Sequence, residues 1–343
     1  MRLSVLDRSR TRQGESHAEA LRATVAFAVE AENLGYQRFW VSEHHGVPGV
    51  AGSAPTVLAA AVAAATSRIR VGTGGVMLPN HQPLVVAEQF GVLESLYPGR
   101  IDMGLGRSVG FTGGVRRALG HDKEDARSFR DQVRELLGYL DGTQQVHPGV
   151  HAYPAEGRRV PPFVLATGAG AEVAADLGLP LVIGAIRGEG PMRAAIRHYR
   201  ENFRPSSWSP YPYVVVSATI AVADTAEDAE RLLWPEAWAM TYARTRGVFP
   251  PLIPAADVPA RMTERERELF TGAMRRQIRG TADDVARELD GLVARTGADE
   301  VLVTTSTYDR GEMLDSYRRL SEVAVSFLSR HATAANNASV SQM

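Results

Sequence analysis

The sequence predicts an α/β protein with a (β/α)8 barrel, the TIM barrel fold, and three observations support this prediction. Short apolar runs alternate with longer segments of helical periodicity along nearly the whole chain, which is typical of parallel strands connected by helices. Eight such runs are present, and eight strand–helix units close into a barrel. The chain has 343 residues, 44% of them hydrophobic, which is enough for one large core. A doubly wound open sheet is the structural alternative.

Turn residues delimit the elements in the first half of the chain. Gly35 ends the first helix, Pro55 lies in the first turn of the second, and Pro98 and Gly99 follow the third. The predicted strands are residues 2–6, 38–42, 69–77 and 101–106, and the predicted helices are residues 15–34, 53–66, 83–97 and 122–140.

The same alternation continues in the second half, with two irregular segments that we interpret as insertions after strands 4 and 7. Segment 141–162 has no clean period, and segment 247–264 contains four prolines. The predicted strands are residues 163–166, 180–184, 214–223 and 300–305, and the predicted helices are residues 171–177, 190–203, 225–244, 281–296 and 309–331. Residues 1–331 are therefore expected to form one barrel domain, followed by a disordered tail at 332–343.

Composition excludes several classes of protein and site. The net charge of −1 leaves no basic excess for binding a nucleic acid backbone. No cysteine is present, which excludes disulfides, thiolate metal sites and a cysteine nucleophile. The N-terminus is too polar for a signal peptide, and no apolar run approaches the ~18 residues of a membrane span. We therefore expect a cytoplasmic protein that binds neither nucleic acid nor membrane.

The second predicted strand ends in three ionisable residues, Glu43, His44 and His45. Catalytic groups of (β/α)8 barrels follow the strand C-termini, so these residues are expected at the barrel mouth. His44 could act there as an acid or base, with Glu43 holding its imidazole or the edge of a ligand. Neighbouring residues on an extended strand point to opposite faces, so His44 and His45 are poorly placed to share a metal ion, and no metal is predicted. Taken alone, the segment also fits a polar strand end without a chemical role.

Three further strand ends suggest a site for a flat, phosphorylated ligand. Glycines at 72, 74 and 75 leave the third strand almost without side chains, as at a bulge or where a flat group approaches the backbone. Arg107 follows the fourth strand, and its guanidinium suits a phosphate or carboxylate. The turn ATGAGAE at 166–172 opens into a helix whose free N–H groups would bind an anion. A flat, redox-active ring with a phosphate is FMN, and neither glycine-rich turn has the dinucleotide-binding spacing.

Three segments carry a family resemblance: EHH at 43–45, VGTGGVMLPNHQPLVVAEQFGVLESLYPGRIDMGLGR at 71–107 and GTADDVARELDGLVARTGADEVLVTT at 280–305. With them the chain resembles the bacterial luciferase-like, flavin-dependent monooxygenases over most of its length. The resemblance implies a TIM barrel that binds reduced FMN, forms a C4a-peroxyflavin with O2 and oxygenates a small apolar substrate. Because no nicotinamide fingerprint is present, a separate flavin reductase is expected to supply FMNH2. Related proteins are often dimers, so a homodimer is expected, with contact through the alanine-rich helix at 59–66 and the helix that begins at Pro83.

Carried over by position, the resemblance implies catalytic roles for His44 and Glu43. It also implies a cis peptide bond between Gly74 and Gly75, against which the flavin ring rests, and a phosphate contact from Arg107. The FMN contacts that it implies are Glu43, Gly74, Gly75, Arg107, Ala166, Thr167, Gly168, Gly170, Gly184 and Ala185.

The chain departs from luciferase at two positions. Gly106 and Ala166 stand where luciferase has a reactive cysteine and a glutamate, so a non-luminescent member is expected. The mobile lid of luciferase has no clear counterpart, unless segment 141–162 or 247–264 serves. Two alternatives stay open: a deazaflavin-dependent oxidoreductase that transfers hydride, and a non-catalytic flavin-binding protein. The presence of both His44 and Arg107 argues against the second.

Overall fold

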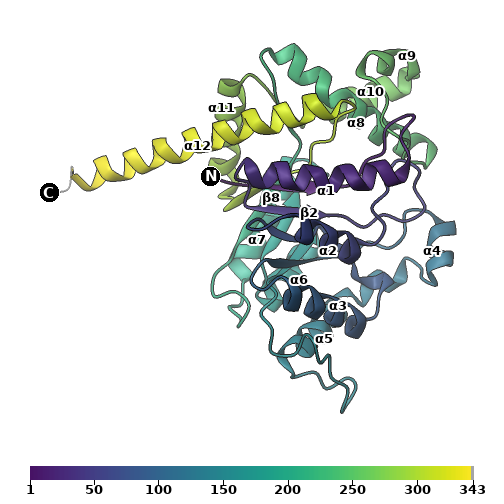
Figure 1. The fold of residues 1–343 in the computed structure, drawn as a ribbon. Coiled ribbons are helices and arrows are strands. Elements are labelled where there is room, and N and C mark those ends of the chain that lie inside the picture. Colours follow the sequence, from purple (N-terminus) through teal and green to yellow (C-terminus); the bar gives the residue numbers. More distant parts are fainter. Residues whose placement is uncertain (341–343) are drawn as a thin grey trace.

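The protein is a closed barrel of parallel strands surrounded by helices (Figure 1). The computed structural model describes residues 1–340, with side chains described through Val325. The barrel strands are β1 (Arg2–Asp7), β2 (Arg38–Val41), β3 (Arg70–Thr73), β5 (Ile101–Gly106), β6 (Pro162–Ala166), β7 (Leu181–Gly184), β8 (Val214–Ala218) and β11 (Glu300–Val303). Strand β1 pairs with both β2 and β11, and the pairing of β3 with β5 completes the ring. The (β/α)8 prediction is thus confirmed, and the open sheet is excluded.

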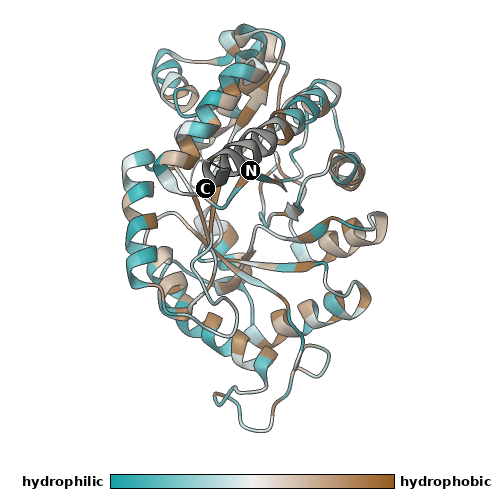
Figure 2. Ribbon diagram, turned by 90° about the vertical axis from the view of Figure 1, so that its left-hand side faces the viewer, coloured by the Kyte–Doolittle hydropathy of each residue, from teal (hydrophilic) through white to brown (hydrophobic). Residues whose placement is uncertain are grey.

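Helices between the strands cover the outside of the barrel and turn polar residues toward solvent (Figure 2). Ser16 and Glu19 form a capping box at the start of the first helix, and Thr281 and Asp284 form the same motif later in the chain. The main helices are α1 (His17–Asn33), α2 (Pro55–Ala65), α3 (Pro83–Leu96), α5 (Phe129–Asp141), α6 (Gly170–Leu177), α7 (Glu189–Asn202), α8 (Ala226–Arg246), α11 (Ala282–Thr296) and α12 (Arg310–Val340).

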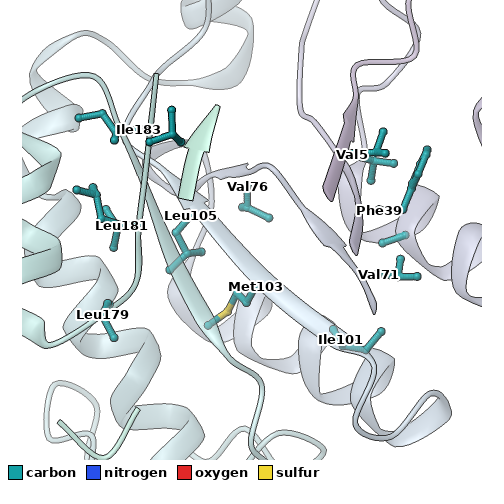
Figure 3. Close-up of a cluster of buried hydrophobic side chains, with 14 of the residues drawn as sticks. Val5, Phe39, Val71, Val76, Ile101, Met103, Leu105, Leu179, Leu181 and Ile183 are labelled. Atoms are coloured by element: carbon teal, nitrogen blue, oxygen red, sulfur yellow. The ribbon is translucent and has the colours of Figure 1, made fainter. Parts of the chain in front are cut away.

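Alternate strand residues build two separate cores. Outward-facing side chains such as Val5, Phe39 and Val71 are fully buried against the helices (Figure 3). Inward-facing residues fill the barrel, where the rings of Trp40 on β2 and Phe163 on β6 meet with centroids 4.9 Å apart. Because β2 and β6 are three strands apart in the ring, this contact crosses the interior, as expected for a barrel that is a packed core and not a pore.

Charged residues close the N-terminal end of the barrel interior. Arg38 donates to Asp102 Oδ2 at 2.7 Å and to Glu300 Oε1 at 3.1 Å, and both carboxylates are fully buried. Arg70 reaches the other oxygen of Asp102 at 2.6 Å, and Tyr213 donates to Glu300 Oε2 at 2.7 Å. Since each buried charge has a partner of opposite sign, this end is sealed, and open space is left at the C-terminal ends of the strands.

Three predicted elements differ from the structure, and one helix was missed. The strand predicted at 69–77 breaks at Gly74 and Gly75 into β3 and the short β4 (Val76–Met77). The strand predicted at 214–223 breaks at Thr219, and its second half, β9 (Ile220–Val222), pairs outside the barrel with β10 (Ile278–Gly280). The helix predicted at 122–140 begins only at Phe129. The sequence analysis also missed α10 (Glu264–Met274), which continues the helical region begun by α9 (Val258–Arg261).

The two segments interpreted as insertions lie at opposite ends of the barrel. Residues 142–161 connect α5 to β6, so they lie at the N-terminal end of the strands, below the barrel in Figure 1. Residues 247–264 follow α8 and lie at the C-terminal end, as does α4 (Gly113–Leu119), which follows β5. Only the second segment is therefore placed to cover a site at the barrel mouth.

The C-terminal helix α12 extends through Val340 and projects away from the barrel (Figure 1). The part of the expected disordered tail that the structure describes, residues 332–340, is therefore helical, and 341–343 lie outside the described residues. The division into one domain and a tail stays a prediction. Within residues 1–340, no helix has the length and apolar character needed to cross a bilayer.

Candidate active site

A cavity of about 540 Å³ opens at the C-terminal ends of the barrel strands. Its size lies within the range of small-molecule and cofactor sites. The predicted site residues that line it are Glu43, His44, Gly74, Gly75, Arg107, Ala166, Thr167, Gly170 and Gly184. Gly168 and Ala185 are not among the lining residues, although the neighbours of Gly168 are, and Ala185 lines an adjoining cavity.

Glu43 is a buried, ionised carboxylate held by three donors. Its Oε2 accepts the Met77 N–H at 2.8 Å, and its Oε1 lies 2.7 Å from His45 Nε2 and 2.9 Å from His81 Nε2. Burial alone would raise the pKa of Glu43, but the hydrogen bonds from His45, His81 and the Met77 N–H outweigh burial and lower the pKa to about 2. The carboxylate therefore carries a fixed negative charge at the cavity wall throughout the physiological pH range.

The suggestion that Glu43 holds the His44 imidazole is wrong, because the nearest partner of that ring is a hydroxyl. His44 Nδ1 lies 3.1 Å from Ser42 Oγ, which leaves Nε2 as the ring nitrogen available to a ligand. Burial lowers the pKa of His44 to about 4, and the positive charges of Arg8 and Arg10 add to this. At neutral pH the ring is therefore uncharged and can donate or accept one proton without carrying a resident charge.

Backbone glycines form the flat floor of the cavity. The Gly74–Gly75 peptide bond is cis, the geometry that the resemblance implied. A Cβ on Gly74 would lie 2.5 Å from Leu6 Cδ1, and one on Gly75 would lie 2.7 Å from the Gly104 carbonyl oxygen. The clash at Gly75 is with backbone and cannot be relieved by a side-chain rotation, whereas at Gly74 the Leu6 side chain would have to move; with glycine at both positions the chain presents only backbone to a ligand here.

Cationic groups and a helix N-terminus gather at another part of the rim. The exposed Arg107 donates from Nε to the carbonyl oxygen of Ala126 at 3.1 Å. It has no ion-pair partner among the side chains that the structure describes. Helix α6 begins next to it at Gly170, and no side chain caps its N-terminus. The lining residue Thr167 adds a hydroxyl. Guanidinium, hydroxyl and free N–H groups together suit a phosphate.

Arg187 is a site residue that the sequence analysis missed. It follows the end of β7 and lines the cavity, and its Nη1 would lie 3.6 Å from a Cβ built on Gly168. The guanidinium therefore lies against the turn at 166–170 and lines the same cavity as Arg107. The available signal was its position, three residues beyond a barrel strand, where other predicted site residues also occur.

Phe249 is a second missed residue, and it comes from segment 247–264. Its ring packs against Phe111 with centroids 4.9 Å apart and lies edge-on to the His44 ring at 6.5 Å. Both phenylalanines line the cavity, so they give its outer wall an apolar surface. Among the residues the structure describes, no cluster of three or more His, Cys, Asp or Glu side chains is arranged to hold a metal ion.

Known proteins share both the sequence and the fold. A family model described as luciferase-like monooxygenase matches residues 1–300. A luciferase-like monooxygenase of Escherichia coli strain K12 is 35% identical over 93% of this chain and 96% of its own length. The N-acetyl-S-alkylcysteine monooxygenase of Bacillus subtilis strain 168 is 32% identical over 95% of this chain and 98% of its own.

Solved structures agree with this assignment. The crystal structure of apo-MsnO8 superposes with a TM-score of 0.82 at 32% identity, covering 94% of this chain and 98% of that one. Two more distant structures show the fold alone. A type II Baeyer–Villiger monooxygenase of Pseudomonas putida in complex with FMN is 18% identical, with a TM-score of 0.68 over 94% of this chain and 96% of its own. An F420-dependent secondary alcohol dehydrogenase is 15% identical, with a TM-score of 0.67 over 92% of this chain and 97% of its own. The chain belongs to the luciferase-like monooxygenase family.

Proposed function

We propose that this protein is a flavin-dependent monooxygenase that uses reduced FMN and O2 to oxygenate an apolar group of an organic substrate. The single observation that carries the proposal is the arrangement of one cavity around a flat backbone floor, an anion-binding rim and a neutral histidine. These three features correspond to the ring, the phosphate and the proton chemistry of a flavin oxygenase.

The residues present fit FMN. The isoalloxazine ring would rest on Gly74 and Gly75, where a side chain would clash, so the flat floor is built into the fold. The phosphate would be held by Arg107, Arg187 and the N-terminus of α6. The cavity of about 540 Å³ lies within the size range of cofactor sites, and His44 lines it together with these groups.

Bound reduced FMN would supply the electrons that activate O2, and the chain supplies binding, water exclusion and a proton. His44 would donate or accept that proton at Nε2, because Ser42 engages Nδ1. Glu43 holds His45 and His81 in place and gives this wall a fixed negative charge. Phe111 and Phe249 would limit the access of water to the reaction.

The proposal includes partners that the fold does not display. A separate reductase would deliver reduced FMN, and the protein would act in the cytoplasm as a homodimer. The dimer contact would be the face of α2 and α3, where Val57, Val92 and Leu96 are 69%, 48% and 63% exposed. Exposed apolar side chains on neighbouring helices are a feature of protein–protein contacts. Analytical sedimentation tests this contact. The wild type is expected to be a dimer and Leu96→Arg a monomer.

Anaerobic titration with reduced FMN, followed by mixing with oxygenated buffer, tests the proposed function. We expect tight binding that Arg107→Ala weakens about tenfold or more, because one charge-assisted contact to the phosphate is removed. We also expect bound flavin to reoxidise more slowly than free flavin, and His44→Ala to bind reduced FMN but to lose substrate oxygenation. N-acetyl-S-alkylcysteine, which the name of the Bacillus subtilis relative gives as its substrate, is the first compound to assay.

The two alternatives predict different outcomes of the same experiment. Binding of reduced coenzyme F420 in preference to reduced FMN would replace the proposal by a deazaflavin-dependent hydride transfer. Binding of reduced FMN without any slowing of its oxidation, and without oxygenation of any test substrate, would favour a non-catalytic flavin-binding protein.

A further inference from the structure

A second cavity, of about 580 Å³, adjoins the first across a wall of four residues. It lies over the C-terminal ends of β7, β8 and β11 and is bounded by α7, α8, α11 and the segment that joins α10 to β10. The residues that line both cavities are Leu6, Gly184, Ile186 and Ser217. The second cavity therefore belongs to the same barrel mouth as the proposed flavin site, but most of its lining is different.

The inner part of this second cavity is apolar. Met192 on α7 and Met240 on α8 face it, together with Leu292 on α11. Val216, Ala218 and Ala237 complete the apolar lining. Methionine side chains are flexible and polarizable, so they adapt to ligands of different shapes. This part of the cavity suits an aliphatic or aromatic group.

The rim, in contrast, carries an excess of arginine. Five arginines and three glutamates line the cavity, and two of these arginines are paired: Arg8 with Glu236 at 3.0 Å and Arg295 with Glu189 at 2.6 Å. The other three, Arg244, Arg275 and Arg276, are exposed and have no side-chain hydrogen bond or ion pair with residues 1–325, whose side chains the structure describes. They come from the end of α8 and from the end of α10, so separate elements direct cations to one rim.

A buried acceptor lies in the wall next to these arginines. Gln277 lines the cavity, and its Oε1 is inaccessible to solvent and has no hydrogen-bond partner in the described chain. An unsatisfied buried polar atom is unfavourable by about 1–3 kcal/mol, so a rotation of the Gln277 amide that brings Oε1 to an N–H or O–H donor of a ligand would be favoured.

We propose that this second cavity binds the substrate and that the substrate is an organic carboxylate with an apolar arm. Arg244, Arg275 and Arg276 would hold the carboxylate, since guanidinium groups bind carboxylates with two parallel hydrogen bonds. The apolar arm would run over the methionines to the shared wall at Leu6, Ile186 and Ser217 and would meet the flavin cavity there. That the cavity binds an anion is argued from its lining residues alone. That the anion is the substrate rests on the proposed function.

The binding of a charged probe and of its neutral analogue tests this proposal. The probe is N-octanoylglycine, which has a carboxylate, an amide N–H and an apolar chain, and the analogue is N-octanoylglycinamide. Calorimetric titration of the wild type should give about tenfold or greater preference for the carboxylate, the effect of one hydrogen-bonded charge pair. The double variant Arg275→Gln/Arg276→Gln should lose that preference. Arg265→Gln, an exposed arginine on α10 that does not line the cavity, should keep it.

A further pair of measurements identifies the carboxylate and separates the two proposals. Octanoate binding as tightly as N-octanoylglycine would indicate a fatty acid, whereas weaker octanoate binding, with the difference lost in Gln277→Leu, would indicate an N-acylated amino acid. Equal affinities of the charged and neutral probes for the wild type, or an equal effect of Arg265→Gln, would overturn the carboxylate site. Reduced FMN is titrated into the same variants. Normal FMN binding, with equal affinities for the charged and the neutral probe, refutes only the carboxylate site. Tighter binding of the charged probe without any binding of FMN refutes only the flavin function.

Discussion

Replacing Glu43 by glutamine tests whether the ionised carboxylate organises this side of the barrel mouth. The glutamine keeps the shape of the side chain but turns an N–H2 group toward one of the donors from His45, His81 or Met77. The native pKa of about 2, against an ordinary value of 4.5, means that ionisation of Glu43 stabilises the fold by about 3 kcal/mol at neutral pH. Because the Glu43 side chain is 0% exposed, solvent screens its interactions little.

The pH dependence gives the sharper test. The native pKa of Glu43 is lowered, so the unfolded chain takes up the proton first as pH falls, and the stabilisation is complete above about pH 5 and fades toward pH 2. Urea unfolding at pH 7, 5, 4 and 3 should show the wild type more stable than Glu43→Gln by about 3 kcal/mol at pH 7 and by only about 1 kcal/mol at pH 3. Asp131→Asn, which removes an exposed carboxylate paired with Arg134, should change stability by about 0–1 kcal/mol. A difference between wild type and Glu43→Gln that stays constant from pH 7 to pH 3 would refute the reasoning.

Three further predictions follow from the same site. In an NMR titration, His44 should titrate near pH 4, and a midpoint near pH 6.5 would contradict a buried ring flanked by cations. The unfolded chain binds this proton first as pH falls, so protonation of His44 should lower the stability of the wild type between pH 6.5 and 4, an effect that His44→Ala should lack. Gly75→Ala should weaken reduced FMN binding and destabilise the fold by about 1–3 kcal/mol, because its Cβ would meet a backbone oxygen at 2.7 Å. Gly272→Ala is the control that should do neither, because a Cβ there meets no atom within 4 Å and the residue lines neither cavity. Glu236→Gln should cost about 3–5 kcal/mol in urea unfolding, because it leaves two guanidinium groups without their buried partner at 3.0 Å, and a loss under 1 kcal/mol would show that the charges are solvated.

The sequence predicted the barrel because its signals are local and repeat. Each strand is a short apolar run, and glycine or proline ends most of the helices, so the strand at 101–106 was predicted with the bounds that β5 has. The same locality explains the errors. The breaks at Gly74 and at Thr219 depend on pairing with strands that are distant in the sequence, since β9 leaves the barrel to pair with β10, 58 residues later.

The site was predictable in its positions but not in its contacts. A strand end places Glu43 and His44 at the mouth, whatever the rest of the chain does. The hydrogen-bond partners of Glu43 could not be predicted in this way, because His81 is 38 residues away and reaches the carboxylate only after β3 and β4 are in place. Phe249, which lies about 200 residues from His44, depends on the path of an irregular segment, and no periodic pattern in the sequence encodes such a path.

The distribution of paired and unpaired charge indicates which kind of ligand each cavity binds. Where a charge supports the fold it is buried and has its partner within the chain, as Glu43 has in two histidines and Arg10 has in Glu236. Where a guanidinium lines either cavity away from such a pair, as at Arg107 and Arg275, no carboxylate of residues 1–325 lies within ion-pair distance. A protein with a net charge of −1 has enough acidic residues to pair these groups, so their isolation is a property of the two rims and not of the composition. The negative charge at each rim is therefore expected from a ligand: the phosphate of FMN at the first and a carboxylate at the second.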